Sequence, residues 1–361
     1  MNNKLYFTPG PSELYPTVPG HVQTALTEKI GVISHRSKQF QDIFKNTTDG
    51  LRQLLSLPDN FHIFFLGSAT EVWERMIQNC VEKNTFHCVN GSFSKRFYEF
   101  SGELQKNAVK AEVPFGEGFF AKNLTIPQET ELICLTHNET SSGASMPVEE
   151  INKVSALNKD ALICVDAVSS LPYPAFDYSK IDSAFFSVQK CFGLPAGLGV
   201  WILNDRCVEK AEALVNRGIA TGTYHSISSL LSKAKSNQTP ETPNVFNIFL
   251  LGKVLEDMNK KGIQAIRKET EEKADAIYDF IEQSEVFSNG VKEPLHRSKT
   301  TIVANTNIPS PNINEHLAPA GMAVGTGYGS YKEKQIRIAN FPTHTPEQVE
   351  KLLKKLGEIK N

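Results

Sequence analysis

The chain lacks the features that mark several classes of protein. Its six cysteines include no Cys-x-x-Cys pair, and reduced thiols in a cytoplasmic protein fit this pattern best. No stretch approaches the roughly 20 apolar residues that a membrane span requires. The segment from Met1 to Gly10 has no apolar core of signal-peptide length. We therefore expect a cytoplasmic protein that is neither secreted nor inserted in a membrane.

An excess of charge of either sign is also missing. The 38 basic and 40 acidic residues give a formal net charge of −2, so no strong overall field favours nucleic acid or anionic lipid. No cluster of histidine, cysteine and carboxylate residues has the spacing of a metal site. Neither a nucleophile elbow nor a Walker loop occurs, and there is no internal repeat.

The chain is long enough for more than one hydrophobic core. It has 361 residues, of which 40% are hydrophobic and 22% are charged. We expect a large domain over residues 16–245 and a smaller C-terminal domain over residues 246–361. Residues 1–15, which include Thr8-Pro9-Gly10-Pro11-Ser12, are expected to form a shaped arm near the functional site, although a plain arm fits the sequence equally well.

Strand-like and helix-like patterns alternate through the first two thirds of the chain. Helices are expected at about residues 18–29, 37–56 and 71–81, and a polar loop at 232–243. Buried strand patterns are found at Phe61 to Leu66, Thr85 to Val89, Ala108 to Val113, Glu131 to Thr136, Ala161 to Asp166, Ser183 to Val188 and Gly199 to Leu203. This alternation predicts an α/β fold with a mainly parallel sheet wrapped by helices.

The end of the chain has a different pattern. A long helical stretch runs from about residue 245 to 286, with a break near Gly262. Strands are expected from Lys299 to Ala304 and from Gln335 to Ala339, followed by a helix at residues 346–359. The sequence therefore predicts a smaller α+β domain at the C-terminus.

Lys190 is the most informative residue of the chain. It follows an apolar strand pattern and precedes a turn rich in glycine, with aromatic residues on both sides. Burial lowers the pKa of a lysine amine and exposes its lone pair, which suits a Schiff base with pyridoxal 5′-phosphate. A surface lysine at the end of a strand is the alternative.

Asp166 ends the preceding strand pattern, at the edge of the sheet where ligands of such folds bind. A carboxylate at this place suits the protonated ring nitrogen of the same cofactor. Acidic residues also cap helices that follow strands, but Ser169 and Ser170 could provide that cap instead.

Three further segments could contact the cofactor. Gly67-Ser68-Ala69-Thr70 joins a strand to a helix, so its amides and hydroxyls could hold a phosphate at the positive end of that helix. Thr140 lies in a polar cluster after a strand, and Phe93 could stack on the ring. A simple turn, a polar loop and a core phenylalanine are the respective alternatives.

Two arginines could bind carboxylates, because the guanidinium group is built for bidentate binding of such anions. Arg36 lies in Ser34-His35-Arg36-Ser37, and Arg337 lies in Gln335-Ile336-Arg337-Ile338. Most single arginines form solvated surface pairs instead. From the residues alone, His35 fits a structural role better than a ligand role.

Together these residues resemble the class V aminotransferases, which are pyridoxal-phosphate enzymes of fold type I, over nearly the whole chain. Ile33 to Ser37, Leu57 to Asn60 and Asn138 to Gly143 are similar to the phosphoserine aminotransferase branch. Thr8 to Ser12, Val165 to Ser170, Gln189 to Gly193 and Gly327 to Ile338 are more similar to the alanine or serine:glyoxylate branch.

The resemblance implies a role for each matching residue. Lys190 would bond to pyridoxal 5′-phosphate, Asp166 would pair with the ring nitrogen, and Phe93 stands where phosphoserine aminotransferases usually carry a tryptophan. The other residues implied in cofactor binding are Ser68, Ala69, Thr70, Thr140, Ser169 and Gln189. Thr242 matches a threonine that reaches the phosphate of the neighbouring subunit's cofactor, which implies a homodimer with shared sites.

The substrate residues are implied in the same way. Arg337 matches the arginine that clamps the α-carboxylate, Arg36 matches one that binds the side-chain anion, and Gly10 and His35 join them. The sequence departs from the phosphoserine branch at Ser68-Ala69-Thr70-Glu71, which replaces a glycine run with arginine, and at Ser330-Tyr331-Lys332, which replaces a His-Arg pair. Lys332, Lys334 or His35 could supply the missing positive charge.

The predicted reaction is transamination between a small amino acid and a 2-oxo acid. L-Phosphoserine with 2-oxoglutarate is the first expectation, and serine or alanine with glyoxylate or pyruvate is the alternative. A cysteine desulfurase or another lyase of the same fold fits less well, because Gln189 stands where desulfurases place a histidine. A non-catalytic protein that binds the cofactor is the remaining alternative.

Overall fold

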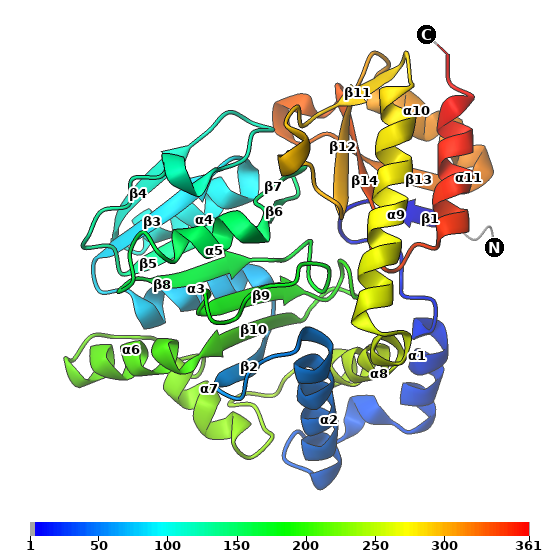
Figure 1. The fold of residues 1–361 in the computed structure, drawn as a ribbon. Helices are drawn as coiled ribbons and strands as arrows, with labels where there is room; N and C mark the ends of the chain where they lie inside the picture. Colours follow the sequence, from blue (N-terminus) through cyan, green and yellow to red (C-terminus); the bar gives the residue numbers. More distant parts are fainter. Residues whose placement is uncertain (1–3, 361) are drawn as a thin grey trace.

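Two β-sheets organise the chain in the computed structural model, which describes residues 4–360 (Figure 1). The larger sheet has seven strands in the order β2-β10-β9-β8-β5-β3-β4. Their bounds are β2 Phe61–Leu66, β10 Gly199–Asn204, β9 Ser183–Ser187, β8 Leu162–Asp166, β5 Leu132–Thr136, β3 Asn84–Val89 and β4 Asn107–Glu112. Only β10 runs antiparallel to its neighbours in this sheet, so the predicted mainly parallel α/β fold is confirmed.

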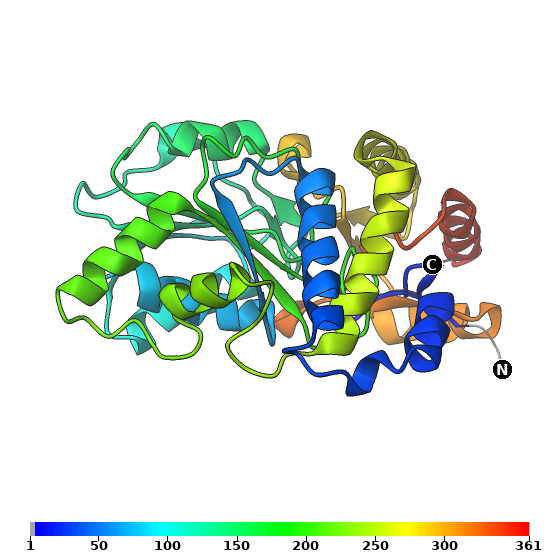
Figure 2. The ribbon, with the colours of Figure 1, turned by 90° about the horizontal axis from the view of Figure 1, so that it is seen from below.

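Helices cover both faces of the larger sheet, as Figure 2 shows from below. One face packs against α2 (Lys38–Leu55), α5 (Val148–Val154) and α8 (Val245–Lys261). The other packs against α3 (Ala69–Cys80), α4 (Ser92–Glu103), α6 (Asp205–Asn216) and α7 (Ile227–Ala234). Along β2, Phe61, Ile63 and Phe65 face the first layer while Phe64 and Leu66 face the second, as the two-residue period of a strand requires.

The smaller sheet has five strands in the order β1-β13-β14-β12-β11. Their bounds are β1 Leu5–Phe7, β13 Met322–Thr326, β14 Gln335–Ala339, β12 Thr301–Thr306 and β11 Phe287–Asn289. It forms a separate core with α9 (Ile263–Glu282), α10 (Ser310–Leu317) and α11 (Pro346–Gly357). Because β1 pairs with β13, the start of the chain is fixed beside residues more than 300 positions away (Figure 1).

The remaining elements are short or lie at the edges. Helix α1 (Val18–Thr27) packs near α8, and β6 (Asn138–Glu139) pairs with β7 (Ala144–Ser145) in a small hairpin. The 3-10 turns are η1 (Ile30–Val32), η2 (Ala121–Asn123), η3 (Pro294–His296), η4 (Ala318–Ala320) and η5 (Gly329–Tyr331).

Most predicted elements occur within one or two residues of their expected bounds. The loop predicted over residues 232–243 is partly wrong, because α7 continues to Ala234 and its apolar face joins the core. The long helix ends at Glu282 rather than near residue 286, since β11 begins at Phe287. Strands β1, β11 and β13 were not predicted, because three to five residues give too short a pattern to separate from a loop.

The six cysteines lie in the part of the chain that the structure describes, and each is buried and free. Within residues 4–360 no helix combines the length and the apolar character needed to cross a bilayer. The same residues contain no group of three potential metal ligands close enough to share an ion.

Gly199 brings β10 against the turn that leads into α3. It pairs with Leu66 of β2 and Ser187 of β9, and a Cβ atom here would overlap the Ser68 carbonyl carbon and lie 2.7 Å from the Ala69 nitrogen. Gly199→Ala should therefore lower the free energy of unfolding by about 1–3 kcal/mol, as overpacking does in other cores. Chemical denaturation measures this change.

Gly102→Ala is the matched control, because Gly102 lies in α4 and a Cβ atom there meets nothing within 4 Å. It should leave stability unchanged or raise it by less than about 1 kcal/mol. Equal stability of the Gly199→Ala variant and the unaltered protein would contradict the close approach seen here.

Candidate active site

A cavity of about 220 Å³ lies at the carboxyl ends of β8 and β9, beside the first turns of α3 and α4. Parallel strands present their carboxyl ends at one edge of the sheet, and this is where ligands of such folds bind. Eight of the predicted site residues line the cavity, namely Gly10, Ala69, Thr70, Phe93, Thr140, Asp166, Gln189 and Lys190.

Lys190 lies just after β9, with part of its side chain accessible from the cavity. Its amine donates a hydrogen bond to the Pro9 carbonyl, and a Cβ atom on Gly10 would overlap the lysine side chain. Glycine at position 10, where φ is +138°, therefore leaves space for the lysine. Burial, and then the charge of Arg337, lower the pKa of Lys190 to about 8, so the neutral amine is a minor form near physiological pH but far more populated than in an ordinary lysine.

Asp166 ends β8 with its carboxylate 3% exposed. Trp73 Nε1 donates to Oδ2 over 3.0 Å and the Val168 amide donates to Oδ1 over 3.0 Å. Burial raises the pKa of Asp166 to about 7, although these hydrogen bonds and the charge of Lys190 oppose the change. Asp166 caps no helix, since residues 167–182 form turns and loops, and its carboxylate is left facing the cavity.

The turn before α3 presents backbone amides at a helix N-terminus. Ser68 Oγ accepts the Glu71 amide over 3.2 Å, so Ser68 caps α3 and is not among the residues that line the cavity. The Ala69 amide donates to Ser187 Oγ over 3.1 Å, and Thr70 follows in the first turn. The positive end of α3 thus points at the cavity, which suits an anion.

Phe93 begins α4 and lies 6.0 Å from the Lys190 amine, measured to the ring centroid. The buried Glu139 carboxylate accepts the amides of Phe93 over 3.4 Å and Ser94 over 2.8 Å. These bonds hold the first turn of α4, so the ring of Phe93 has a fixed place beside the amine.

A hydroxyl network supports the wall opposite Phe93. Thr140 Oγ1 donates to Ser169 Oγ over 2.7 Å, and Asn138 Nδ2 donates to the same oxygen over 2.7 Å. Thr140 and Asn138 line the cavity, whereas Ser169 lies behind them and is fully buried. Ser169 therefore orients the lining residues rather than facing the cavity itself.

Arg337 reaches this region from β14 of the smaller sheet. Its Nε donates to the Thr326 carbonyl over 2.7 Å and its Nη1 to the Thr140 carbonyl over 3.3 Å, and Tyr328 lies 5.4 Å beneath the guanidinium. Burial lowers the pKa of Arg337. Within residues 4–360 no carboxylate forms an ion pair with it, so its charge is available to an anionic ligand.

Three predicted residues lie elsewhere in the chain. Arg36 donates to the carbonyls of Thr239 over 2.6 Å and Pro240 over 3.0 Å, and His35 precedes it. Thr242 is exposed two residues beyond Pro240. The surface segment around Thr239 and Pro240 thus brings together His35, Arg36 and Thr242. None of these three residues lines the cavity of its own chain.

Sequence reasoning missed Trp73 and Asn138. Trp73 is four residues after Ala69, so both lie on one face of α3, and helical spacing could have indicated that face. Asn138 lies in the polar cluster that contains Thr140, but no pattern distinguishes it from its neighbours.

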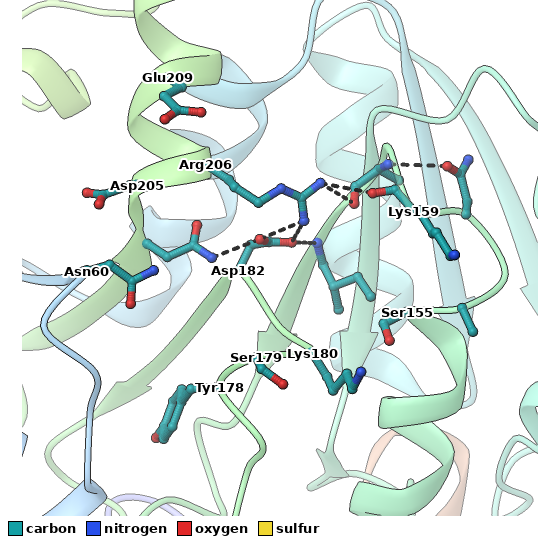
Figure 3. Close-up of a pocket in the computed structure, with 15 residues that line it drawn as sticks. Asn60, Ser155, Lys159, Tyr178, Ser179, Lys180, Asp182, Asp205, Arg206 and Glu209 are labelled. Atoms are coloured by element: carbon teal, nitrogen blue, oxygen red, sulfur yellow. Dashed lines mark hydrogen bonds and ion pairs between the residues drawn. The ribbon is translucent and has the colours of Figure 1, made fainter.

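A second hollow, of about 450 Å³, lies at the opposite, amino ends of β8 and β9. Arg206 forms an ion pair here, as Figure 3 shows: its Nη1 donates to both Asp182 oxygens, over 3.0 and 3.1 Å. Arg206 Nη2 donates to the Lys159 carbonyl over 3.1 Å. These contacts fasten α6 to the sheet and give the Arg206–Asp182 pair a structural role.

Comparisons with known proteins agree with this geometry. The family model described as Aminotransferase class-V matches residues 120–352. A phosphoserine aminotransferase of Rhodococcus opacus is 26% identical over 354 residues, which cover 97% of this chain and 93% of the relative. The solved phosphoserine aminotransferase of Cytophaga hutchinsonii is 65% identical, covers 100% of both chains and gives a TM-score of 0.99.

A pyridoxal-phosphate-bound phosphoserine aminotransferase of Trichomonas vaginalis is 20% identical with a TM-score of 0.81, and covers 99% of this chain and 100% of its own; it shares the fold. The family match spans more than half of the chain, and the Cytophaga structure corresponds to it from end to end. The cavity with its buried lysine and aspartate lies in a protein that belongs to the class V aminotransferases.

Proposed function

We propose that the protein is a pyridoxal-phosphate-dependent L-phosphoserine:2-oxoglutarate aminotransferase. The observation that carries the proposal is the cavity beside α3 that both Lys190 and Asp166 line, in a chain 65% identical to a phosphoserine aminotransferase along its whole length. Such an enzyme moves an amino group from a small amino acid to a 2-oxo acid.

The residues of the cavity fit the cofactor. Thr70, in the first turn of α3, could hold the phosphate at the positive end of that helix, and Gln189 lines the same cavity. Asp166 suits the ring nitrogen, Thr140 the ring oxygen, and Phe93 a face of the ring. When bound, the cofactor supplies an electron-withdrawing ring that lowers the barrier to removing a proton from the substrate carbon.

Lys190 would perform two tasks with one amine. Only its neutral form could attack an aldehyde, and the pKa of about 8 makes this form more available than in an ordinary lysine. When not bonded to the cofactor, Nζ would be a base placed to take the proton from the substrate α-carbon. The Pro9 carbonyl accepts a hydrogen bond from this amine.

Asp166 would keep a positive charge on the ring nitrogen. A cation beside a carboxylate lowers the pKa of that carboxylate, so a protonated ring would return Asp166 to its charged form against the effect of burial. The Trp73 and Val168 hydrogen bonds favour the same form and fix the carboxylate orientation.

Arg337 would bind the substrate α-carboxylate, because it is a half-buried arginine without an ion-pair partner among the described residues. A fixed carboxylate determines which bond of the α-carbon faces Lys190. Gly10 is the residue of the arm that lies against this amine, so we place it at the edge of the substrate space.

We propose a homodimer in which His35, Arg36 and Thr242 serve the partner's site. Support comes from the exposure of Arg36 and Thr242, from the contacts of Arg36 with residues 239–240, and from the absence of all three residues from the lining of the cavity of their own chain. In this arrangement Thr242 reaches the cofactor phosphate and Arg36 the substrate side-chain phosphate, with Lys332 and Lys334 as additional cations.

We also propose two features that the sequence predicts, the domain boundaries and the location in the cell. The division into residues 16–245 and 246–361, with residues 1–15 as an arm, stays a proposal: two separate hydrophobic cores support two domains, but α8 packs in the core of the larger one. A cytoplasmic location follows from six buried thiols that remain unpaired.

The rate at which the cofactor-free protein combines with pyridoxal 5′-phosphate should depend on the titration of Lys190. Below pH 8 the rate constant should rise about tenfold per pH unit as the neutral amine accumulates, and it should level off above about pH 8. Stopped-flow absorbance of the coloured complex measures this profile. Arg337→Gln removes a nearby cation and should move the inflection to higher pH.

An ordinary lysine would give a different profile, because its pKa is 10.5. A rate that continues to rise past pH 10 would show that Lys190 is not desolvated in the way the structure indicates.

L-Phosphoserine should convert the cofactor-loaded protein to its amino form in a single-turnover reaction, and L-glutamate should do the same. Serine and alanine should react more slowly, because neither offers an anion to Arg36. Arg36→Ala should raise KM for L-phosphoserine by about tenfold or more while the response to alanine stays unchanged. Absorbance spectra recorded with each amino acid give both results.

Lys38→Ala is the matched control, since Lys38 is an exposed cation two residues away that pairs with Asp42. It should leave KM for L-phosphoserine unchanged. Reaction with serine or alanine and none with phosphoserine would assign the protein to the glyoxylate branch instead.

A further inference from the structure

His225 lies buried between carboxylates from two separate segments. Its side chain is 5% exposed, its Nδ1 contacts Glu71 Oε1 in the first turn of α3, and its Nε2 lies 3.1 Å from Glu241 Oε2 in the loop before α8. The Tyr224 ring covers it at a centroid distance of 4.1 Å. This histidine is outside the cavity and has no part in the chemistry described above.

The charges around this histidine favour its protonated form. Burial lowers the pKa of His225, but the hydrogen bond to Glu71 and the charges of Glu71 and Glu241 outweigh that effect and raise the pKa to about 9. Arg75 Nε also approaches Glu71, at 3.6 Å, and Glu241 acts on His35. A cation therefore joins two carboxylates at neutral pH.

Glu71 connects this ion pair to the turn that faces the cofactor. Its Oε2 accepts the Gly67 amide over 3.0 Å, and its own amide donates to Ser68 Oγ over 3.2 Å. The carboxylate thus holds the Gly67 end of the turn, and the backbone amide of the same residue holds Ser68. If Glu71 moves, the amides that suit a phosphate move with it.

Glu241 connects the same histidine to the surface segment proposed to serve the partner. The carbonyls of Thr239 and Pro240, just before it, accept hydrogen bonds from Arg36, and Thr242 follows it. Glu241 is therefore, with the contacts of Arg36, one anchor of a segment that does not line the cavity of its own chain.

We propose that His225 is a positioning residue that links two parts of its own chain. It fixes the turn from Gly67 to Thr70, which lies at the chain's own site, relative to the segment from Thr239 to Pro243, which would serve the partner's site. The inference rests on the proposed function. The link is the bridge formed by Glu71, His225 and Glu241. Breaking this bridge should weaken the binding of the cofactor phosphate.

The test compares two cofactor forms, pyridoxal 5′-phosphate and pyridoxal, which share the aldehyde and ring but differ in the phosphate. His225→Gln should raise the dissociation constant for pyridoxal 5′-phosphate about tenfold, because charge-assisted hydrogen bonds to the turn are lost. The dissociation constant for pyridoxal should change by less than about twofold. Absorbance titration of the cofactor-free protein measures both constants without any turnover.

His62→Gln is the matched control. His62 Nε2 binds Asp205 Oδ1 over 2.7 Å at the other end of β2, the strand that leads into the same turn. This variant should leave both dissociation constants unchanged. Equal weakening of both cofactor forms in His225→Gln, or no weakening of either, would overturn the inference.

Glu241→Gln alone, which breaks the other end of the bridge, should also weaken binding of pyridoxal 5′-phosphate and not of pyridoxal, so it gives a result if His225→Gln folds poorly. Where both variants fold, a double-mutant cycle follows. The two substitutions remove the same bridge, so the double variant should bind pyridoxal 5′-phosphate no more weakly than the weaker single variant. Additive losses would overturn the bridge. If the unaltered protein fails to bind pyridoxal 5′-phosphate at all, the proposed function itself fails, which is a distinct outcome.

Discussion

The site depends on the desolvation of one amine beside one carboxylate. Strands β8 and β9 are parallel neighbours, so Asp166 and Lys190 leave the sheet at the same edge. Enclosure lowers the pKa of the lysine to about 8 and raises that of the aspartate to about 7. The pKa values of both groups therefore lie near neutral pH, where each group can gain or lose a proton when a ligand binds.

The rest of the fold maintains this arrangement. Arg337 comes from the smaller sheet and Gly10 from the arm that β1 fixes to it, so the cavity closes only when the two cores are packed together. Trp73 and Glu139 hold Asp166 and Phe93 in place through buried hydrogen bonds. A buried polar group without a hydrogen-bond partner lowers the stability of the folded protein. The hydrogen bonds among these groups offset that loss.

Part of the site could be predicted from the sequence because the pattern of the larger sheet is local. Six-residue apolar runs ending in Asp166 or leading to Lys190 define both the strands and the edge where the chemistry lies. The place of Arg337 beside Thr140, by contrast, depends on contacts between residues 197 positions apart. The bridge of His225 escaped prediction for the same reason, since Glu71 and Glu241 come from distant segments and show no periodic pattern.

Borohydride reduction followed by peptide mapping tests the central claim most directly. The protein is loaded with pyridoxal 5′-phosphate, reduced, digested and examined by mass spectrometry, with Lys190→Ala treated in parallel. The account predicts a pyridoxyl group on Lys190 and on no other lysine, and none in the variant. A modified lysine elsewhere, or an unmodified Lys190 in a loaded and active protein, would contradict it.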